Sequence, residues 1–220
     1  LENESQVLNS IQLERLQSAR ASFDAPVVII SEEEAVLNEG SRSDQIKTWH
    51  YKADNVRDFA WVSSRKFIWD AQAVQLNQKT TIAMSLYPKE GNPLWEQEST
   101  KAVVNTLKSY SEMTIEYPYP VAISVHTAAI GMEYPMICFN YGRPDKKGNY
   151  SAMTKWSMIS VIIHEVGHNF FPMIINSDER QWSWMDEGLN TFLETKTSME
   201  RYPEMPIQVG TPETIKDFMS

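Results

Sequence analysis

The chain has 220 residues, of which 42% are hydrophobic, and its seven Trp, nine Tyr and eight Phe can supply a sizeable core, which argues against disorder. The formal net charge of −9 disfavours nucleic acid as a partner, and without a run of about 18 apolar residues we expect no membrane insertion. The single cysteine, Cys138, excludes an intrachain disulfide.

The N-terminal part of the chain mixes helix and strand signals. Apolar residues at helical spacing predict a helix over residues 3–20. The β-branched run at 27–30 predicts a short strand, and the acidic run at 32–34 predicts a helix start, because acidic side chains stabilise that end of the helix dipole. Residues 36–46 are typical of a surface loop.

Aromatic residues are concentrated between residues 48 and 63, where we predict two strands around a turn at 53–55. A helix is predicted over residues 94–113, and the segment YPYP at 117–120 breaks it. Further strands are predicted at residues 80–87, 121–127 and 132–139.

The last third of the chain has strong helical signals. Residues 154–171 form the strongest predicted helix, with Ser151 or Thr154 as its N-cap and Pro172 as its stop. Two more helices are predicted, over residues 186–199 and from Thr211 onward.

Two histidines stand one turn apart in the predicted helix at 154–171. His164 and His168 are four residues apart, so their imidazoles project from one face and can ligate one metal ion. Glu165 is rotated by about 100° from His164, so it flanks the metal and can take a proton from a water bound there. The pattern predicts a zinc site with Glu165 as general base.

A catalytic zinc site needs a third protein ligand and one open position. Glu187 starts the next predicted helix, after a stretch long enough for the chain to turn back, and completes a His2Glu set with His164 and His168. We therefore predict one Zn²⁺ ion.

Neighbouring groups should orient these ligands. Thr191 and Glu194 share the helical face of Glu187, and Glu194 is the candidate acceptor for a ligand histidine. The alternative for Glu194 is an acid that faces solvent.

At these residues the sequence resembles the aminopeptidase N family of gluzincin metallopeptidases, whose members include leukotriene hydrolase. The family pattern is HExxH, eighteen residues, and then Glu within W-x-x-E-G, which matches HEVGH at 164–168 and WMDEG at 184–188. A second family signature, G-x-M-E-N, is similar to residues 130–134, where Met132 and Glu133 match and Tyr134 replaces Asn.

The resemblance implies roles for residues outside the metal site. Glu133 would bind the free α-amino group of a peptide substrate, with Gly131 and Met132 in the strand that pairs with the substrate backbone. It also implies an α+β fold, part of a thermolysin-like (zincin) catalytic domain preceded by the end of a β-saddle domain. We place the end of that N-terminal β domain, with an added helix, at residues 1–75, and the first half of the catalytic domain at 76–220.

Members of this family are several times longer, carry a helical domain after the catalytic one, and use a downstream tyrosine to stabilise the oxyanion. The resemblance therefore implies that this chain is a fragment that binds zinc, cleaves peptides weakly at most, and packs against a helical domain in the full-length protein. The compartment stays open, with the cell envelope or an extracytoplasmic location favoured over the cytoplasm.

We thus expect a zinc-dependent aminopeptidase fragment that acts on peptides with a free N-terminus. Two alternatives remain open on the sequence, a zinc endopeptidase and a non-catalytic scaffold that keeps a structural zinc ion.

Overall fold

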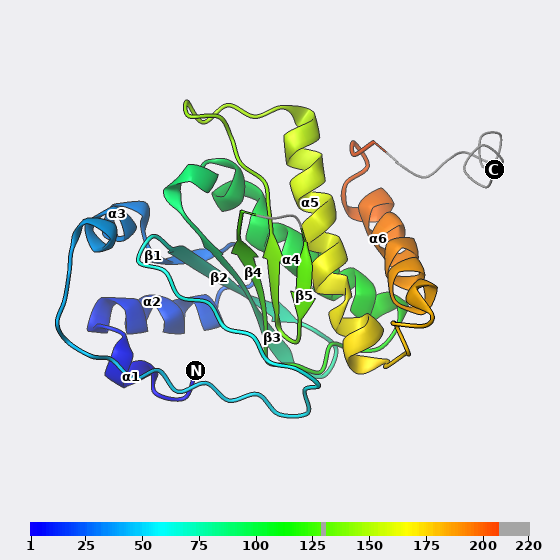
Figure 1. Ribbon diagram of the computed structural model, residues 1–220, viewed down its shortest axis with the longest axis horizontal. Helices are drawn as coiled ribbons and strands as arrows, with labels where there is room; N and C mark the ends of the chain where they lie inside the picture. Colours follow the sequence, from blue (N-terminus) through cyan, green and yellow to red (C-terminus); the bar gives the residue numbers. More distant parts are fainter. Residues whose placement is uncertain (129–130, 207–220) are drawn as a thin grey trace.

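The computed structural model describes residues 1–128 and 131–206 and shows a mixed six-stranded sheet packed with helices (Figure 1). The strands are β1 (Val27–Ile30), β2 (Ile68–Gln75), β3 (Thr80–Tyr87), β4 (Val121–His126), β5 (Met132–Tyr134) and β6 (Ile137–Asn140). The helices are α1 (Glu4–Val7), α2 (Ser10–Arg20), α3 (Glu32–Gly40), α4 (Leu94–Met113), α5 (Ala152–Gly167) and α6 (Glu187–Arg201), with short helical turns η1 (Lys89–Gly91), η2 (Asn169–Ile174) and η3 (Ser183–Met185). The chain therefore combines helices with one mixed sheet.

The sheet has the strand order β1-β2-β3-β4-β6-β5. Strands β3, β4 and β6 are parallel to one another, whereas β1, β2 and β5 run antiparallel to their neighbours. Helix α4 makes the long crossover from β3 to β4 that a parallel pair requires. Strand β5 ends the sheet, so in the described part of the chain one of its sides has no strand partner.

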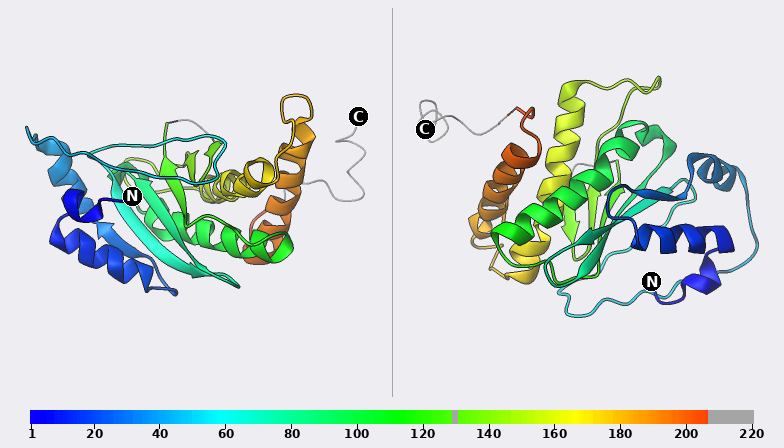
Figure 2. Two further views of the ribbon diagram at one scale, coloured as in Figure 1. Left: turned by 90° about the horizontal axis from the view of Figure 1, so that it is seen from below. Right: turned by 180° about the vertical axis from the view of Figure 1, so that it is seen from behind.

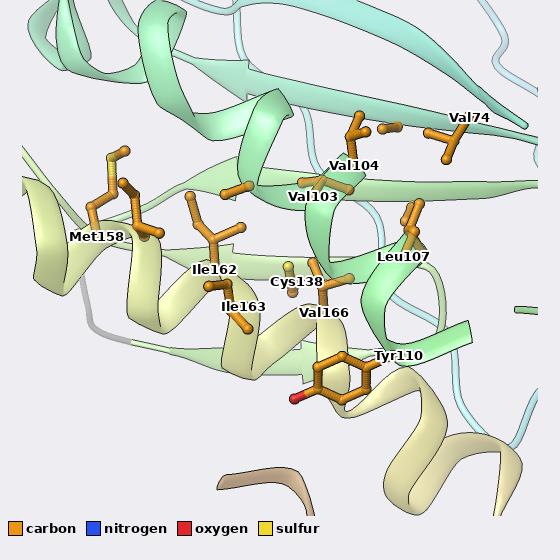
Figure 3. Close-up of a cluster of buried hydrophobic side chains, with 14 of the residues drawn as sticks. Val74, Val103, Val104, Leu107, Tyr110, Cys138, Met158, Ile162, Ile163 and Val166 are labelled. Carbon is orange, nitrogen blue, oxygen red and sulfur yellow. The ribbon is translucent and has the colours of Figure 1, made fainter. Parts of the chain in front are cut away.

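The buried hydrophobic residues form two clusters. Successive side chains of a strand point to opposite faces of the sheet, so one sheet contributes to both clusters. Leu16 of α2 packs with Ala71 of β2 in the smaller cluster. Leu107 of α4 and Ile162 of α5 belong to the larger cluster, where α4 lies against β2, β3 and β4, and α5 lies against β4 and β6 (Figure 3). The views in Figure 2 place α1 and α2 far from α5 and α6.

The predicted helix over residues 3–20 is interrupted by a cap. Helix α1 ends at Val7, and the Asn9 side chain accepts a hydrogen bond of 2.9 Å from the Gln12 amide at the start of α2. Asparagine favours this position because its side chain satisfies a free amide of the first turn. The loop predicted from residue 36 begins only after Gly40, because α3 continues to that residue.

The two strands predicted between residues 48 and 63 are absent from the structure. The aromatic side chains of that segment, Trp61 among them at 66% exposed, lie in an irregular stretch. Strand preference of aromatic residues expresses packing against neighbouring strands, and none of the strands that the structure describes pairs with this segment.

Strand β2 lies in a stretch for which the sequence predicts no element, and it carries two polar residues that are buried, Asp70 and Gln72. It forms a hairpin with β3, in a register from Ile68 opposite Tyr87 to Gln75 opposite Thr80. The domain boundary expected between residues 75 and 76 falls where β2 ends and the turn of this hairpin begins.

The single strand predicted at residues 132–139 is two strands, β5 and β6, paired antiparallel. Pro135 has no amide hydrogen for a ladder, and Met136 has a φ of 67°, so the chain reverses at these residues. The reversal turns β5 into an edge strand.

Helix α5 begins at Ala152, two residues before the predicted start, and of the two predicted caps it uses Ser151, whose side chain accepts from the Thr154 amide at 3.0 Å. Its regular part ends at Gly167, four residues before the predicted end, and Phe171 has extended dihedral angles. Pro172 explains the extended Phe171, because proline disfavours the helical conformation of the residue before it.

The predicted helix near Thr211 lies outside the described residues. Within the described residues, no helix combines the length and the hydropathy needed to cross a bilayer.

Candidate metal centre

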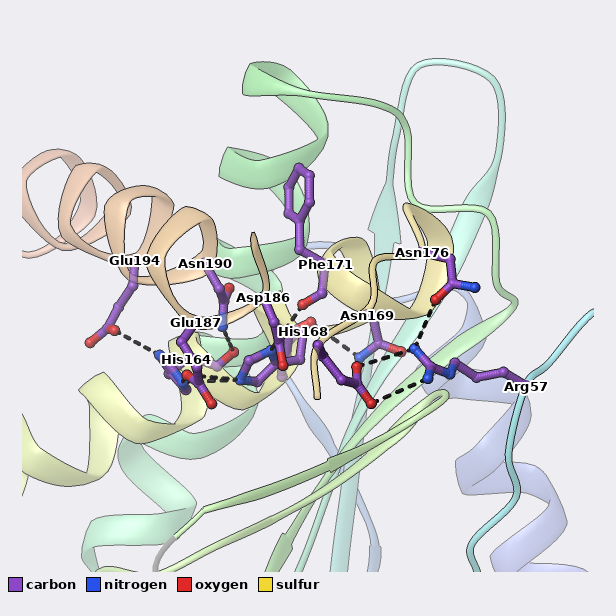
Figure 4. Close-up of polar contacts among 12 residues, drawn as sticks. Arg57, His164, His168, Asn169, Phe171, Asn176, Asp186, Glu187, Asn190 and Glu194 are labelled. Carbon is purple, nitrogen blue, oxygen red and sulfur yellow. Dashed lines mark hydrogen bonds and ion pairs between the residues drawn. The ribbon is translucent and has the colours of Figure 1, made fainter. Parts of the chain in front are cut away.

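Helices α5 and α6 pack against each other where α5 ends and α6 begins (Figure 4). The buried side chains Ile159, Ile162 and Ile163 fix α5 in the core. His164 and His168 project from the last turn of the same helix, and Glu187 opens α6 beside them. The structure thus brings together the three residues that the sequence predicted as metal ligands.

The three side chains offer donor atoms at distances that suit one metal ion. His164 Nε2 lies 3.0 Å from His168 Nε2 and 3.0 Å from Glu187 Oε2, and His168 Nε2 lies 3.7 Å from Glu187 Oε2. Zinc bonds of about 2.0–2.1 Å at tetrahedral angles put neighbouring ligand atoms roughly 3.3 Å apart. The three separations fall on both sides of that value, so the residues fit a zinc ion.

The opposite ring nitrogens explain which atoms face the centre. His164 Nδ1 lies 3.0 Å from Glu194 Oε2, and His168 Nδ1 lies 2.9 Å from the Phe171 carbonyl. Each of those oxygens only accepts, so in the neutral form each histidine carries its proton on Nδ1 and a lone pair on Nε2. Two lone pairs and a carboxylate oxygen then converge without a proton between them, an arrangement that a cation stabilises.

Acidic groups around His164 and His168 stabilise positive charge at the candidate metal centre. Burial alone would lower the pKa of His168, but nearby Asp186 and Glu133 and the Phe171 carbonyl together raise it to about 9. Burial also lowers the pKa of His164, but the Glu194 carboxylate outweighs this effect, so the pKa is raised. Protons therefore occupy the histidines readily when nothing else does, and a metal ion must compete with them.

Glu165 lies beside the histidines and is only 6% exposed. Its Oε2 atom has no hydrogen-bond partner within the described residues. Burial raises the pKa of Glu165 to about 7, with a further contribution from the carboxylates of Glu133 and Glu187 and an opposing one from the histidines. A carboxyl group with a pKa near neutrality can both accept and return a proton at that pH.

Gly131 lies directly against Glu165. The residue has a φ of 47°, which glycine adopts without strain, and a β-carbon at this position would overlap Glu165 Oε1 and lie 3.1 Å from its carboxyl carbon. The neighbouring Met132 is 45% exposed on β5. Glu133, also on β5, places a carboxylate oxygen within 4.8 Å of ligand atoms of His168 and Asp186.

Glu194 accepts from two side chains on α5, with Oε2 at 3.0 Å from His164 Nδ1 and Oε1 bonded to the Ser160 hydroxyl. The acid is therefore turned toward the site and away from solvent. Thr191 is exposed, and no side-chain hydrogen bond within the described residues joins it to a predicted ligand. Ser160, which holds Glu194, was not identified from the sequence, where it reads as an ordinary helical residue.

Asp186 was also not recognised as part of the site. Its Oδ1 atom lies 2.8 Å from His168 Nδ1, close enough for an ion pair with a protonated imidazole. The contact is electrostatic, and the side chain is 6% exposed. Its position before Glu187 was the available signal, but aspartate at a helix start normally indicates a cap.

No protein-family model and no curated protein matches the sequence. Aminopeptidase A of Legionella pneumophila, solved in complex with aspartic acid, has a similar structure with a TM-score of 0.51 at 14% identity, over 61% of this chain and 16% of that chain. The M1 zinc metallopeptidase of Deinococcus radiodurans matches with a TM-score of 0.45 at 16% identity, over 61% of this chain and 29% of that chain. A variant of a two-domain M1 zinc metallopeptidase bound to L-arginine gives a TM-score of 0.47 at 16% identity, over 62% and 29% of the two chains.

These similarities concern the fold. The chain spans less than a third of the length of the structures it matches.

Proposed function

We propose that this chain forms the zinc-binding part of a metallopeptidase active site of the gluzincin type. The observation that carries the proposal is the convergence of His164 Nε2, His168 Nε2 and Glu187 Oε2, three acceptor atoms spaced as zinc ligands. The shared fold with a solved aminopeptidase supports it.

The chemistry follows from the groups around that centre. A zinc ion held there would act as a Lewis acid toward a substrate carbonyl and acidify a water molecule. Glu165 would accept the proton at Oε2, which has no hydrogen-bond partner among the described residues, and return it to the leaving amine, which its pKa of about 7 permits. Glu194 and the Phe171 carbonyl hold both histidines with their Nε2 atoms toward the centre.

We further propose that the reaction is aminopeptidase cleavage. Glu133 stands on the edge strand β5, close to His168 and Asp186, where a carboxylate would pair with the protonated N-terminus of a peptide. An extended substrate would add to the free side of β5 through main-chain hydrogen bonds. The orientation that both contacts impose would place the first peptide bond at the centre.

In this proposal residues 76–220 belong to the first half of a thermolysin-like domain, and a helical domain of a longer protein packs against it. The exposed apolar side chains of Leu189, Phe192 and Met199 on α6 support such a contact.

Metal analysis of the purified chain tests the centre. We expect one zinc ion per chain in the wild type and a large loss in His168→Ala. Equal zinc content in both proteins would rule out the proposed ligand set.

Catalysis is tested in the full-length protein with Glu165→Gln, which we expect to keep zinc while activity falls on the order of a hundredfold or more. Full activity of Glu165→Gln on every substrate would rule out Glu165 as general base, and the site would then be interpreted as a zinc-binding scaffold.

Exopeptidase specificity is tested with Glu133→Ala. We expect this change to impair cleavage of peptides with a free amine far more than cleavage of N-blocked peptides. Equal impairment would point to an endopeptidase.

A further inference from the structure

Helix α6 carries Glu187 but has few apolar contacts that fix its position. Its buried residues are Asn190, Leu193 and Thr197, of which only Leu193 is apolar. The residue at its N-cap, Asp186, makes no capping hydrogen bond with its side chain. Because hydrophobic burial is not directional, the placement of Glu187 depends on polar contacts.

Asn190 makes the most buried of these contacts and has no exposed surface (Figure 4). Its Nδ2 donates a hydrogen bond of 2.8 Å to the main-chain carbonyl of His164, which is itself a predicted ligand. Its Oδ1 accepts a hydrogen bond of 2.8 Å from the hydroxyl of Tyr110 on α4. One amide side chain thus joins α6 to both neighbouring helices.

Gly167 makes room for this amide. A β-carbon at residue 167 would lie 2.7 Å from Tyr110 Cζ and would overlap Asn190 Oδ1. Such distances are far shorter than van der Waals contact, so any side chain here would displace the Asn190 amide or the Tyr110 ring. The glycine between Glu165 and His168 therefore serves helix packing.

We propose that Asn190, seated against Gly167 and held by Tyr110, is a positioning residue that sets the place of Glu187 relative to the two histidines. Asn190 follows Glu187 by three residues, so the two lie about one helical turn apart. The Asn190 side chain donates its hydrogen bond to the main-chain carbonyl of His164. This contact therefore fixes the helix that carries Glu187 relative to His164. This inference rests on the proposed metal centre.

The zinc affinity of the chain, measured by competition with a chelator, tests the inference. In Asn190→Ala we expect the affinity to fall on the order of tenfold or more, the effect known for groups that orient metal ligands. Asn190→Asp keeps an acceptor for Tyr110 but has no donor for the His164 carbonyl, so we expect a similar loss. Tyr110→Phe removes only the hydroxyl and should cause a smaller loss.

A second readout separates positioning from general loosening of the fold. With Co²⁺ in place of zinc, the visible spectrum reports the geometry of the ligands, and we expect it to change in Asn190→Ala.

Asn105→Ala is the matched control, because Asn105 of α4 donates a hydrogen bond of 2.9 Å to Tyr202, just beyond the far end of α6. This control should keep both the zinc affinity and the cobalt spectrum of the wild type.

Wild-type affinity and spectrum in Asn190→Ala and Asn190→Asp would overturn the inference, as would equal losses in Asn105→Ala. A wild-type chain that binds no zinc would instead overturn the proposed metal centre, and the inference with it.

Steric coupling gives an independent check. Gly167→Ala should lower zinc affinity strongly in the wild type and less in an Asn190→Ala background, where one of the two obstructed groups is gone. Additive effects of the two changes would contradict the proposed contact.

Discussion

The backbone of Gly131 lies against the carboxylate of Glu165, so closely that a β-carbon on residue 131 would overlap Glu165 Oε1. The contact connects the start of the edge strand β5 with the proposed general base on α5. A change at residue 131 must therefore displace Glu165 or the strand.

In the proposed peptidase, Gly131→Ala should lower kcat/KM on the order of a hundredfold, the cost of a displacement of about 1 Å at a reacting group. Zinc content should stay unchanged, because the three atoms nearest to such a β-carbon belong to Glu165 and Val161 and not to a predicted ligand. Gly148→Ala is the control, since Gly148 also has a positive φ, of 82°, but its β-carbon would meet only Pro93, at 3.4 Å. Equal losses in both variants would mean that backbone strain alone is responsible.

Glu194→Gln should weaken zinc binding by about 10- to 100-fold, because a neutral amide holds the His164 imidazole less firmly than a carboxylate does. Ser160→Ala should weaken it less, since it removes only the support of Glu194. Glu200→Gln changes another acid of α6, bonded to Ser109, and should leave zinc affinity unchanged. Titration against a chelator measures all three, and unchanged affinity in Glu194→Gln would contradict the role of this acid.

Zinc binding should release protons and weaken as the pH falls. The metal-free chain holds a proton on His168 at neutral pH, because the pKa of that histidine is raised to about 9, and the metal must displace it. Each displaced proton makes the apparent affinity fall about tenfold per pH unit below that pKa. Calorimetry in buffers of different ionisation enthalpy measures the number of protons released, and a value of zero would contradict this prediction.

Removal of zinc should lower the melting temperature of the chain, because a ligand that binds only the folded state stabilises it. Treatment with the same chelator should leave the melting temperature of His168→Ala unchanged, because this variant lacks one of the proposed zinc ligands. An equal fall in both proteins would show that the chelator acts elsewhere.

The buried carboxyl of Asp70 should make stability depend on pH far from the metal centre. Burial raises its pKa to about 6, even though Thr100 and Tyr87 donate hydrogen bonds to it. The folded chain then holds a proton that the unfolded chain loses near the ordinary value of 3.8. The resulting stabilisation is complete below about pH 4 and is lost as the pH rises through about 6, a change of roughly 3 kcal/mol.

Urea unfolding of the wild type and of Asp70→Asn between pH 4 and 7 measures this effect. The amide does not titrate, so the difference between the two curves should show the decline, and parallel curves would contradict the assignment.

Local patterns predicted much of the fold. Helix α4 and strand β3 have the predicted bounds, because their periodicity and their flanking prolines are local signals. The sequence wrongly predicted strands at residues 48–63 and missed strand β2, and both errors have one cause. Whether a stretch becomes a strand depends on its partners, and the buried Asp70 of β2 accepts hydrogen bonds from Thr100 and Tyr87, which lie elsewhere in the chain.

The sequence by itself predicted which residues gather at the candidate centre, because spacing along one helix places His164, Glu165 and His168 around a common point. The structure agrees with that placement and puts Glu187 beside them. Only the tertiary structure decided which groups hold these residues. Asp186, Ser160 and Asn190 act across helix contacts that no local pattern records, because such contacts depend on how α5 and α6 pack and not on spacing along either helix.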